Sequence, residues 1–179
     1  MLTFRAGCAI LIIVGGQGKP HRKRQGGYKI MTTSNISRFA PVGVKNRGDA
    51  REWAVCAHMG VERGKHDSGA YDRDSDVNAG DLHISVKSSG FTLMSGNLCE
   101  GLDSFDAIWN LYRSKTHSNC FAYVDEDFNL TLMDIDEFEK FVYTFCHIER
   151  ESEKNGGAMK IRCRKESAKM RAWLAANAR

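Results

Sequence analysis

The chain lacks the features of several common protein classes. No two of its six cysteines are spaced as C-x-x-C, and without such close ligand pairs a structural zinc site is not expected. The apolar stretch at residues 6–14 is much shorter than the roughly 20 residues that a membrane-spanning helix needs. Internal repeats and low-complexity segments are also absent from the sequence. These absences favour a soluble, cytoplasmic globular protein whose cysteines are reduced and buried.

The first thirty residues are expected to lie outside the folded part. The apolar stretch is followed at once by a basic run at residues 19–24, and the residues after Met31 are typical of the start of a domain. We therefore predict that residues 1–30 are a disordered or non-native extension. Residues 31–179 are predicted to form one domain, long enough to bury a core without disulfides. A signal peptide, with Arg5 before the apolar stretch, is the alternative interpretation.

The net charge of the chain does not identify its binding partner. The net charge of +4 and the pI near 8.7 are compatible with binding to nucleic acid. An enzyme with another kind of substrate fits the same charge.

A strand pair is the most informative pattern in the sequence. Residues 70–77 and 81–88 are predicted to be strands joined by a turn at residues 78–80. The second strand alternates: Leu82, Ile84 and Val86 lie on one face. Its opposite face carries polar side chains, namely Asp81, His83, Ser85 and Lys87.

The remaining patterns predict an α/β protein with a mixed central β-sheet flanked by helices. Residues 31–45 show no periodicity and are predicted to be a loop, and residues 91–94 are predicted to extend the sheet. The other predicted strands are 119–124, 128–133 and 159–164, and the predicted helices are 48–60, 103–115, 134–148 with Asp134 as its cap, and 165–176. The helix at 103–115 is long enough to connect two parallel strands.

The strand pair brings together the residue types that phosphodiester hydrolysis requires. Such a reaction needs a divalent metal on hard carboxylate ligands and benefits from a fixed cation near the developing charge. Asp76 could supply the carboxylate and Lys87 the cation. Glu52, on the preceding helix, could add a second carboxylate.

These residues resemble the PD-(D/E)XK nuclease superfamily, which includes type II restriction endonucleases and Holliday junction resolvases. The resemblance covers residues 46–125 and rests on Glu52 in a helix, Asp76 at a strand end, and Lys87 on the next strand. It implies a restriction-endonuclease-like core. It also implies that Glu52 and Asp76 bind Mg²⁺, which Mn²⁺ can replace, and that Lys87 assists the attacking water.

Position 85 departs from this pattern. The family usually has an acid there, whereas this chain has Ser85, a poor metal ligand. Ser85 is therefore a candidate member of the site but not a metal ligand. Acids that could compensate are Glu52, Asp74 and Asp81. Asp72 lies in the same acidic region, where clustered acids either bind metal or belong to a turn.

Two further groups of residues are candidates for DNA contact. His83 shares the polar face of the strand with Lys87. Ser88 is the residue directly after Lys87. Near the C-terminus, Lys160, Arg162 and Arg164 alternate along one face of a predicted strand, which suits a phosphate backbone. A charged edge strand that resists aggregation gives the same pattern.

The sequence thus leads to one principal hypothesis, a Mg²⁺-dependent endonuclease that cleaves double-stranded DNA in the manner of a restriction enzyme. A junction resolvase is an alternative that the helix with Glu52 mildly favours. A catalytically inactive DNA-binding protein is another, favoured by Ser85. Symmetric cleavage of two strands would suit a homodimer.

Overall fold

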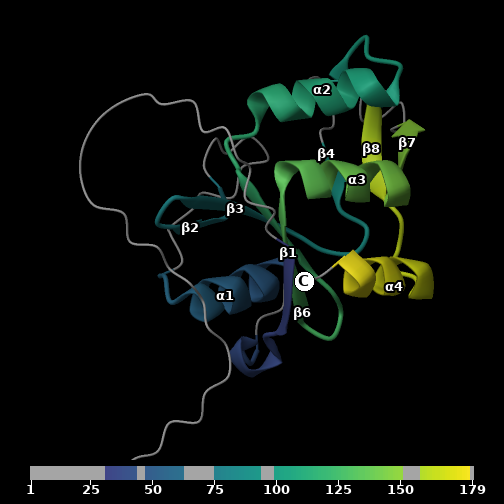
Figure 1. The fold of residues 1–179 in the computed structure, drawn as a ribbon. Coiled ribbons are helices and arrows are strands. Elements are labelled where there is room, and N and C mark those ends of the chain that lie inside the picture. The colour runs from purple at the N-terminus through teal and green to yellow at the C-terminus, as the bar shows by residue number, and fades with distance from the viewer. Residues whose placement is uncertain (1–30, 44–46, 63–74, 94–98, 151–157, 178–179) are drawn as a thin grey trace, which may run out of the picture.

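A computed structural model of the protein describes residues 31–43, 47–62, 75–93, 99–150 and 158–177 (Figure 1). Within these ranges the chain forms an α/β fold with a mixed five-stranded sheet, a three-stranded sheet and four α-helices. The strands are β1 (Met31–Asn35), β2 (Val77–Ala79), β3 (Leu82–Lys87), β4 (Thr92–Leu93), β5 (Cys120–Val124), β6 (Asn129–Asp134), β7 (Cys146–Arg150) and β8 (Met159–Cys163). The helices are α1 (Arg47–Met59), α2 (Phe105–Lys115), α3 (Ile135–Phe145) and α4 (Ala168–Asn177), with a short 3₁₀ turn at Ser37–Phe39.

The larger sheet has the order β1-β6-β5-β3-β2 and confirms the predicted mixed topology. Strands β3 and β5 are parallel, and α2 lies in the connection between them, as the length of that connection predicted. The other neighbours in this sheet pair antiparallel. Strand β5 is buried along its whole length, so β3 is held against the centre of the sheet.

The smaller sheet has the order β4-β8-β7 and was not predicted. Residues 91–94 were expected to extend the central sheet, but β4 pairs with β8 instead. The helix expected to run to residue 148 ends at Phe145, and β7 begins at once with Cys146. Residues 145–148, Phe-Cys-His-Ile, are too short a segment for hydrophobic periodicity to separate helix from strand.

Strand β1 is another correction. Residues 31–45 were predicted to be a loop, yet Met31–Asn35 pairs with β6 at the edge of the larger sheet. Four of its five residues are polar. An edge strand needs no apolar alternation when most of its side chains face solvent, so hydrophobic periodicity did not reveal it.

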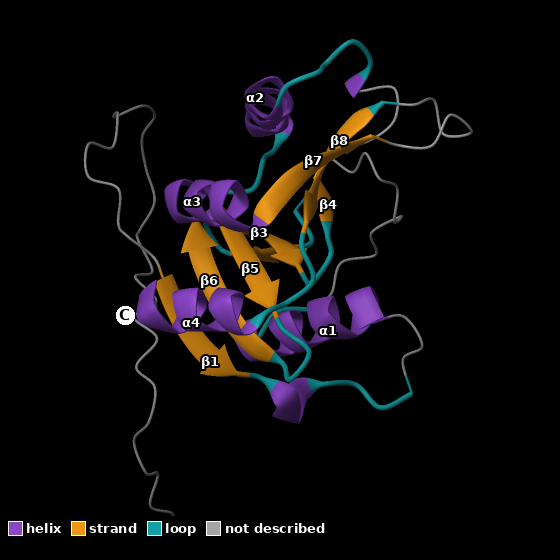
Figure 2. Cartoon of the chain, turned by 90° about the vertical axis from the view of Figure 1, so that its right-hand side faces the viewer, coloured by secondary structure: helices purple, strands orange, loops and turns teal. Residues whose placement is uncertain are grey.

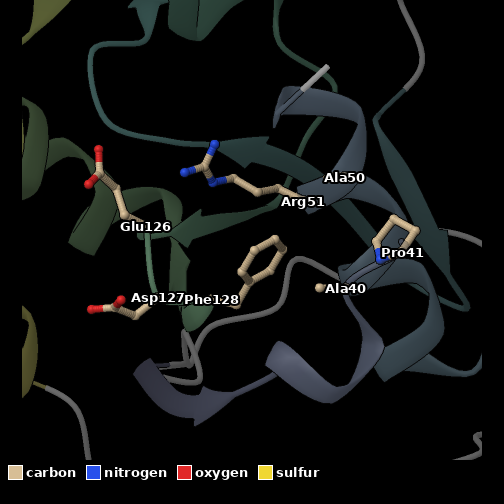
Figure 3. Close-up of a pocket in the computed structure, with 7 residues that line it drawn as sticks. All are labelled: Ala40, Pro41, Ala50, Arg51, Glu126, Asp127 and Phe128. Carbon is tan, nitrogen blue, oxygen red and sulfur yellow. The ribbon is translucent and has the colours of Figure 1, made fainter. Parts of the chain in front are cut away.

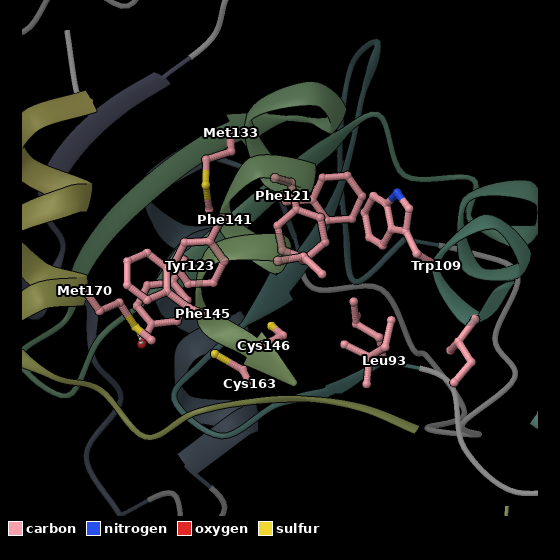
Figure 4. Packing of buried hydrophobic residues seen from close by; sticks show 14 of the residues in the cluster. Leu93, Trp109, Phe121, Tyr123, Met133, Phe141, Phe145, Cys146, Cys163 and Met170 are labelled. Atoms are coloured by element: carbon pink, nitrogen blue, oxygen red, sulfur yellow. Dashed lines mark hydrogen bonds between the residues drawn. The ribbon is translucent and has the colours of Figure 1, made fainter. Parts of the chain in front are cut away.

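The larger sheet is covered on both faces (Figure 2). One face packs with α1 through a cluster that includes Val55, Ile84 and Val124. The opposite face packs against α3, α4 and the smaller sheet through an aromatic cluster (Figure 4). In that cluster the rings of Phe121 and Phe138 stack with centroids 4.0 Å apart. The sheet is therefore anchored from both sides, and β3 is a rigid platform for any side chain at its end.

Helix α3 begins as predicted. The carboxylate of Asp134 accepts a hydrogen bond from the backbone N–H of Glu137 at 2.8 Å, which is an N-cap. The final helix begins at Ala168, three residues later than predicted. Among the residues that the structure describes, no helix is long and apolar enough to span a membrane. A cytoplasmic location stays a prediction.

Candidate functional site

Asp76 directly precedes β2, at the open end of the β2–β3 hairpin. The expected strand at 70–77 lies mostly outside the described residues, and the strand that the structure describes starts at Val77. Asn78 and Ala79 belong to this strand rather than to the turn, which consists of Gly80 and Asp81. Gly80 has φ of +62°, a value suited to glycine in a two-residue hairpin turn. Because Val77 lies opposite Ile84, Asp76 lies opposite Ser85, one step further.

The carboxylate of Asp76 is held by two hydrogen bonds from β3. The backbone N–H of Val86 donates to Oδ2 at 2.6 Å, and the hydroxyl of Ser85 donates to the same oxygen at 3.1 Å. Within the described part of the chain, both hydrogen bonds that Asp76 accepts end on Oδ2. One carboxylate oxygen is thus fixed in place while Oδ1 is left for another ligand.

Lys87 lies at the end of β3, on the same face as Ser85. Burial lowers the pKa of its ammonium group, and the negative charges of Asp76 and Glu52 oppose that shift. Both carboxylates therefore act on the same ammonium group, although they come from different elements. Asp76, Lys87 and Glu52 thus form one electrostatic cluster, and their role as a site stays a prediction.

Tyr112 is a neighbour that sequence reasoning missed. It lies on α2, and its hydroxyl group interacts with Thr116 and Ser85 near Asp76. Burial raises the pKa of Tyr112 well above its usual range, so this group remains a neutral phenol. A tyrosine on an apolar face always carries a hydroxyl that needs a partner when buried, and that is the signal that could have identified it.

The donor set fits a magnesium ion with few protein ligands. Mg²⁺ usually keeps several waters and takes one or two carboxylates from the protein. Asp76 Oδ1 and the Glu52 carboxylate would be such a pair. Among the described residues, no three His, Cys, Asp or Glu side chains gather as a metal cluster. The cluster supplies two carboxylates, which are oxygen ligands of the kind that a hard cation takes.

Of the three other acids considered, Asp72, Asp74 and Asp81, the structure describes Asp81. Asp81 lies in the hairpin turn, four residues from Ser85, which corresponds to about 13 Å along a strand. This position argues against a role for Asp81 as a compensating ligand. Asp72 and Asp74 lie outside the described residues.

His83 and Ser88 flank the cluster along β3. The His83 ring is exposed, and its Nδ1 hydrogen-bonds to Asn78 Oδ1 at 2.8 Å. The carbonyl of Ser88 accepts a hydrogen bond from Phe91 N–H in the turn after the strand. His83 and Ser88 are close in sequence to the cluster, so both are candidates to contact the sugar-phosphate backbone of a bound DNA. Their role in DNA binding stays a prediction.

The basic row on β8 is present but partly neutralised. Lys160 and Arg162 approach Glu149 on the neighbouring strand β7, with nitrogen–oxygen distances of 3.9 and 3.4 Å. The sequence did not indicate that Glu149 lies beside the basic row, because its segment was predicted to be helix and loop rather than a strand. Arg164, just after β8, is exposed. The row therefore offers less positive charge than its sequence indicated.

A cavity of about 500 Å³ lies beside α1 (Figure 3). It is lined by Ala40, Pro41, Ala50, Arg51, Glu126, Asp127 and Phe128. Arg51 is buried, and its Nε donates to the carbonyl of Asp125 at 3.4 Å. Because Glu52 follows Arg51 on the same helix, the packing that fixes Arg51 also helps to fix α1 at the candidate site.

Comparison of the chain with models of protein families, with curated proteins and with solved structures finds no match.

Proposed function

We propose that this protein is a metal-dependent DNA endonuclease with a restriction-endonuclease-like core. The observation that carries the proposal is the desolvated Lys87 ammonium group, on which the carboxylates of Asp76 and Glu52 both act. A partly buried lysine on which two acids act is costly to maintain on an inner strand of the sheet without a use for it.

Each residue has a definable task in the reaction. Asp76, fixed through Oδ2, presents its other oxygen, and Glu52 provides the second carboxylate for Mg²⁺ or Mn²⁺. The metal supplies positive charge for a non-bridging phosphate oxygen and lowers the pKa of a bound water when it is present. Lys87 orients the attacking water and stabilises the negative charge that develops on the phosphate. Ser85 keeps Asp76 in place.

The test is cleavage of supercoiled plasmid and phage DNA with Mg²⁺, with Mn²⁺ and with EDTA. We expect metal-dependent fragments from the wild-type protein and at least a hundredfold loss of rate in Asp76→Asn and Lys87→Ala, because each change removes a group that acts on the transition state. Lys169→Ala, on the exposed face of α4, is the matched control and should cleave normally.

Circular dichroism and thermal melting establish that each variant is folded. Full cleavage by folded Lys87→Ala protein would contradict the proposal. Discrete fragments would give the recognition sequence, and preferential cleavage of four-way junctions over linear duplex would instead favour a resolvase. Cleavage of both strands at symmetric positions should accompany a homodimer in sedimentation.

A DNA-binding protein without catalysis is the second candidate. The observation that favours it is the serine hydroxyl that bonds to Asp76 at the place where a second strand carboxylate would stand. Metal-independent binding to double-stranded DNA, with no cleavage by the folded wild-type protein under either metal, would support this candidate. The basic row Lys160, Arg162 and Arg164 would then be its contact surface.

A further inference from the structure

Two cysteines face each other across the smaller sheet. Cys146 is the first residue of β7 and lies directly opposite Cys163, the last residue of β8. Both side chains are buried in the aromatic cluster, where Figure 4 shows them on the same side of the sheet. Each thiol shifts the pKa of the other, upward at Cys146 and downward at Cys163. The strand register thus places two interacting thiols opposite each other.

The backbone hydrogen bonds define the type of this pair. Arg164 N–H donates to the carbonyl of Phe145 at 3.0 Å, one step outside the pair, while Cys163 N–H points away to Phe91 on the other side. Cys146 and Cys163 are therefore a non-hydrogen-bonded pair. Such pairs have Cα atoms about 4.5 Å apart. That separation lies within the range of about 4.4–6.8 Å that a disulfide spans.

We propose that Cys146 and Cys163 form a disulfide bond when the folded protein meets a disulfide oxidant such as oxidised glutathione. One cysteine thiolate attacks oxidised glutathione, which forms a mixed disulfide and releases one glutathione thiolate. The second cysteine thiolate then attacks the mixed disulfide and releases the other glutathione. The two protons of the cysteines end on the two glutathione molecules, so the protein pair is oxidised by two electrons and the reagent is reduced by two.

The pair is asymmetric, which indicates the order of attack. The hydrogen bond from Cys146 lowers the pKa of the Cys163 thiol, whereas the same bond and burial raise the pKa of the Cys146 thiol. Cys163 is therefore the first nucleophile. Access does not require global unfolding, because β7 is the edge strand of its sheet and edge strands open locally.

The other described cysteines provide internal controls. Cys120 on β5 is just as buried but lies opposite Ile84 and Asp134. Cys56 lies in the other apolar cluster, on α1. Strand register therefore pairs Cys146 with Cys163. Cys99 lies in the same apolar cluster and is the competing partner that the experiment checks.

The experiment equilibrates the full-length protein in glutathione buffers of increasing oxidised fraction, under native conditions. The mixture is quenched in acid, alkylated and mapped by mass spectrometry. We expect a linked peptide containing Cys146 and Cys163, lighter than the two reduced peptides by two hydrogens. The melting temperature should rise by about 5–10 °C without reductant and fall back with dithiothreitol, because the bond closes a loop in the unfolded chain.

Two variants sharpen the result. Cys120→Ala should keep both the linked peptide and the reductant-sensitive rise in melting temperature, whereas Cys163→Ala should lose both. Absence of the linked peptide in fully oxidised glutathione, while the wild-type protein remains folded, overturns the proposal. A disulfide between either cysteine and Cys99 overturns it equally. Both of these outcomes are measured on the wild-type protein, so they do not depend on whether a variant folds.

Discussion

Replacing Ser85 by aspartate should lower the unfolding free energy without metal and raise it again when Mg²⁺ is added. In the wild-type protein the Ser85 hydroxyl lies 3.1 Å from Asp76 Oδ2 and donates a hydrogen bond to it. In Ser85→Asp a carboxylate oxygen would occupy nearly the same place. At that separation and an effective dielectric constant of about 20, the repulsion between the two charges is about 5 kcal/mol. The nearby Lys87 offsets part of it, and we expect a net loss of about 3 kcal/mol in unfolding free energy without metal.

Magnesium should reverse this loss. Two adjacent carboxylates bind a divalent cation more tightly than one, and a ligand at a hundred times its dissociation constant stabilises the folded state by about 2.7 kcal/mol. For a chain of this size, each kcal/mol corresponds to about 2–4 °C in melting temperature. Ser85→Asp should thus melt about 6–12 °C below the wild type in EDTA and recover most of that difference in excess Mg²⁺.

Thermal melts of the wild type, Ser85→Asp and Ser85→Asn, each with EDTA and with Mg²⁺, make the measurement. Ser85→Asn is similar in size and uncharged, so it reports any steric cost of the longer side chain. Equal melting temperatures for Ser85→Asp and Ser85→Asn in EDTA would show that residue 85 does not face Asp76. A loss in EDTA that Mg²⁺ does not reverse would refute the metal site while leaving the hairpin geometry intact.

Three further predictions concern the fold. Phe138→Ala should lower the unfolding free energy in urea by about 3–5 kcal/mol, because it leaves a cavity against the stacked ring of Phe121. Asp134→Ala should cost about 1 kcal/mol through loss of the α3 cap, while Asp136→Ala, exposed in the first turn, should cost less than half of that in the same assay. Burial raises the pKa of Cys120 to about 12, so the folded state keeps a proton that the unfolded state loses above its ordinary value of 9.0. Stability should therefore decline with rising pH between these values, and Cys120→Ala should decline less steeply in pH-dependent urea melts.

The sequence predicted best what depends on neighbouring positions in the chain. The alternation of apolar Ile84 with polar Ser85 and Lys87 predicted β3 and its two faces. The short hairpin then places Asp76 beside Ser85. The crossover length gave the parallel pairing of β3 with β5. In these cases a local pattern and a short connection leave few arrangements of the backbone.

Errors arose where a short segment depends on distant partners. Strand β7 was interpreted as the end of a helix, because the apolar pattern of α3 continues into Cys146 and Ile148. That single error hid two features at once: Glu149, which approaches the basic row, and Cys146 opposite Cys163. A short strand that follows a helix without a break becomes evident only when its neighbour in the sheet is known.

The candidate site combines both kinds of determinant. Asp76 and Lys87 are set by the pairing of two adjacent strands, so their proximity follows from register and tolerates small shifts of the helices. Glu52 and Tyr112 come from α1 and α2, and their positions depend on how each helix packs on the sheet. A change in the apolar face of α1, such as Val55→Ala, should therefore disturb Glu52 while leaving the two bonds to Asp76 Oδ2 in place. If the site is a nuclease centre, such a variant loses metal affinity before it loses the strand geometry, and titration of Mg²⁺ in the cleavage assay separates the two effects.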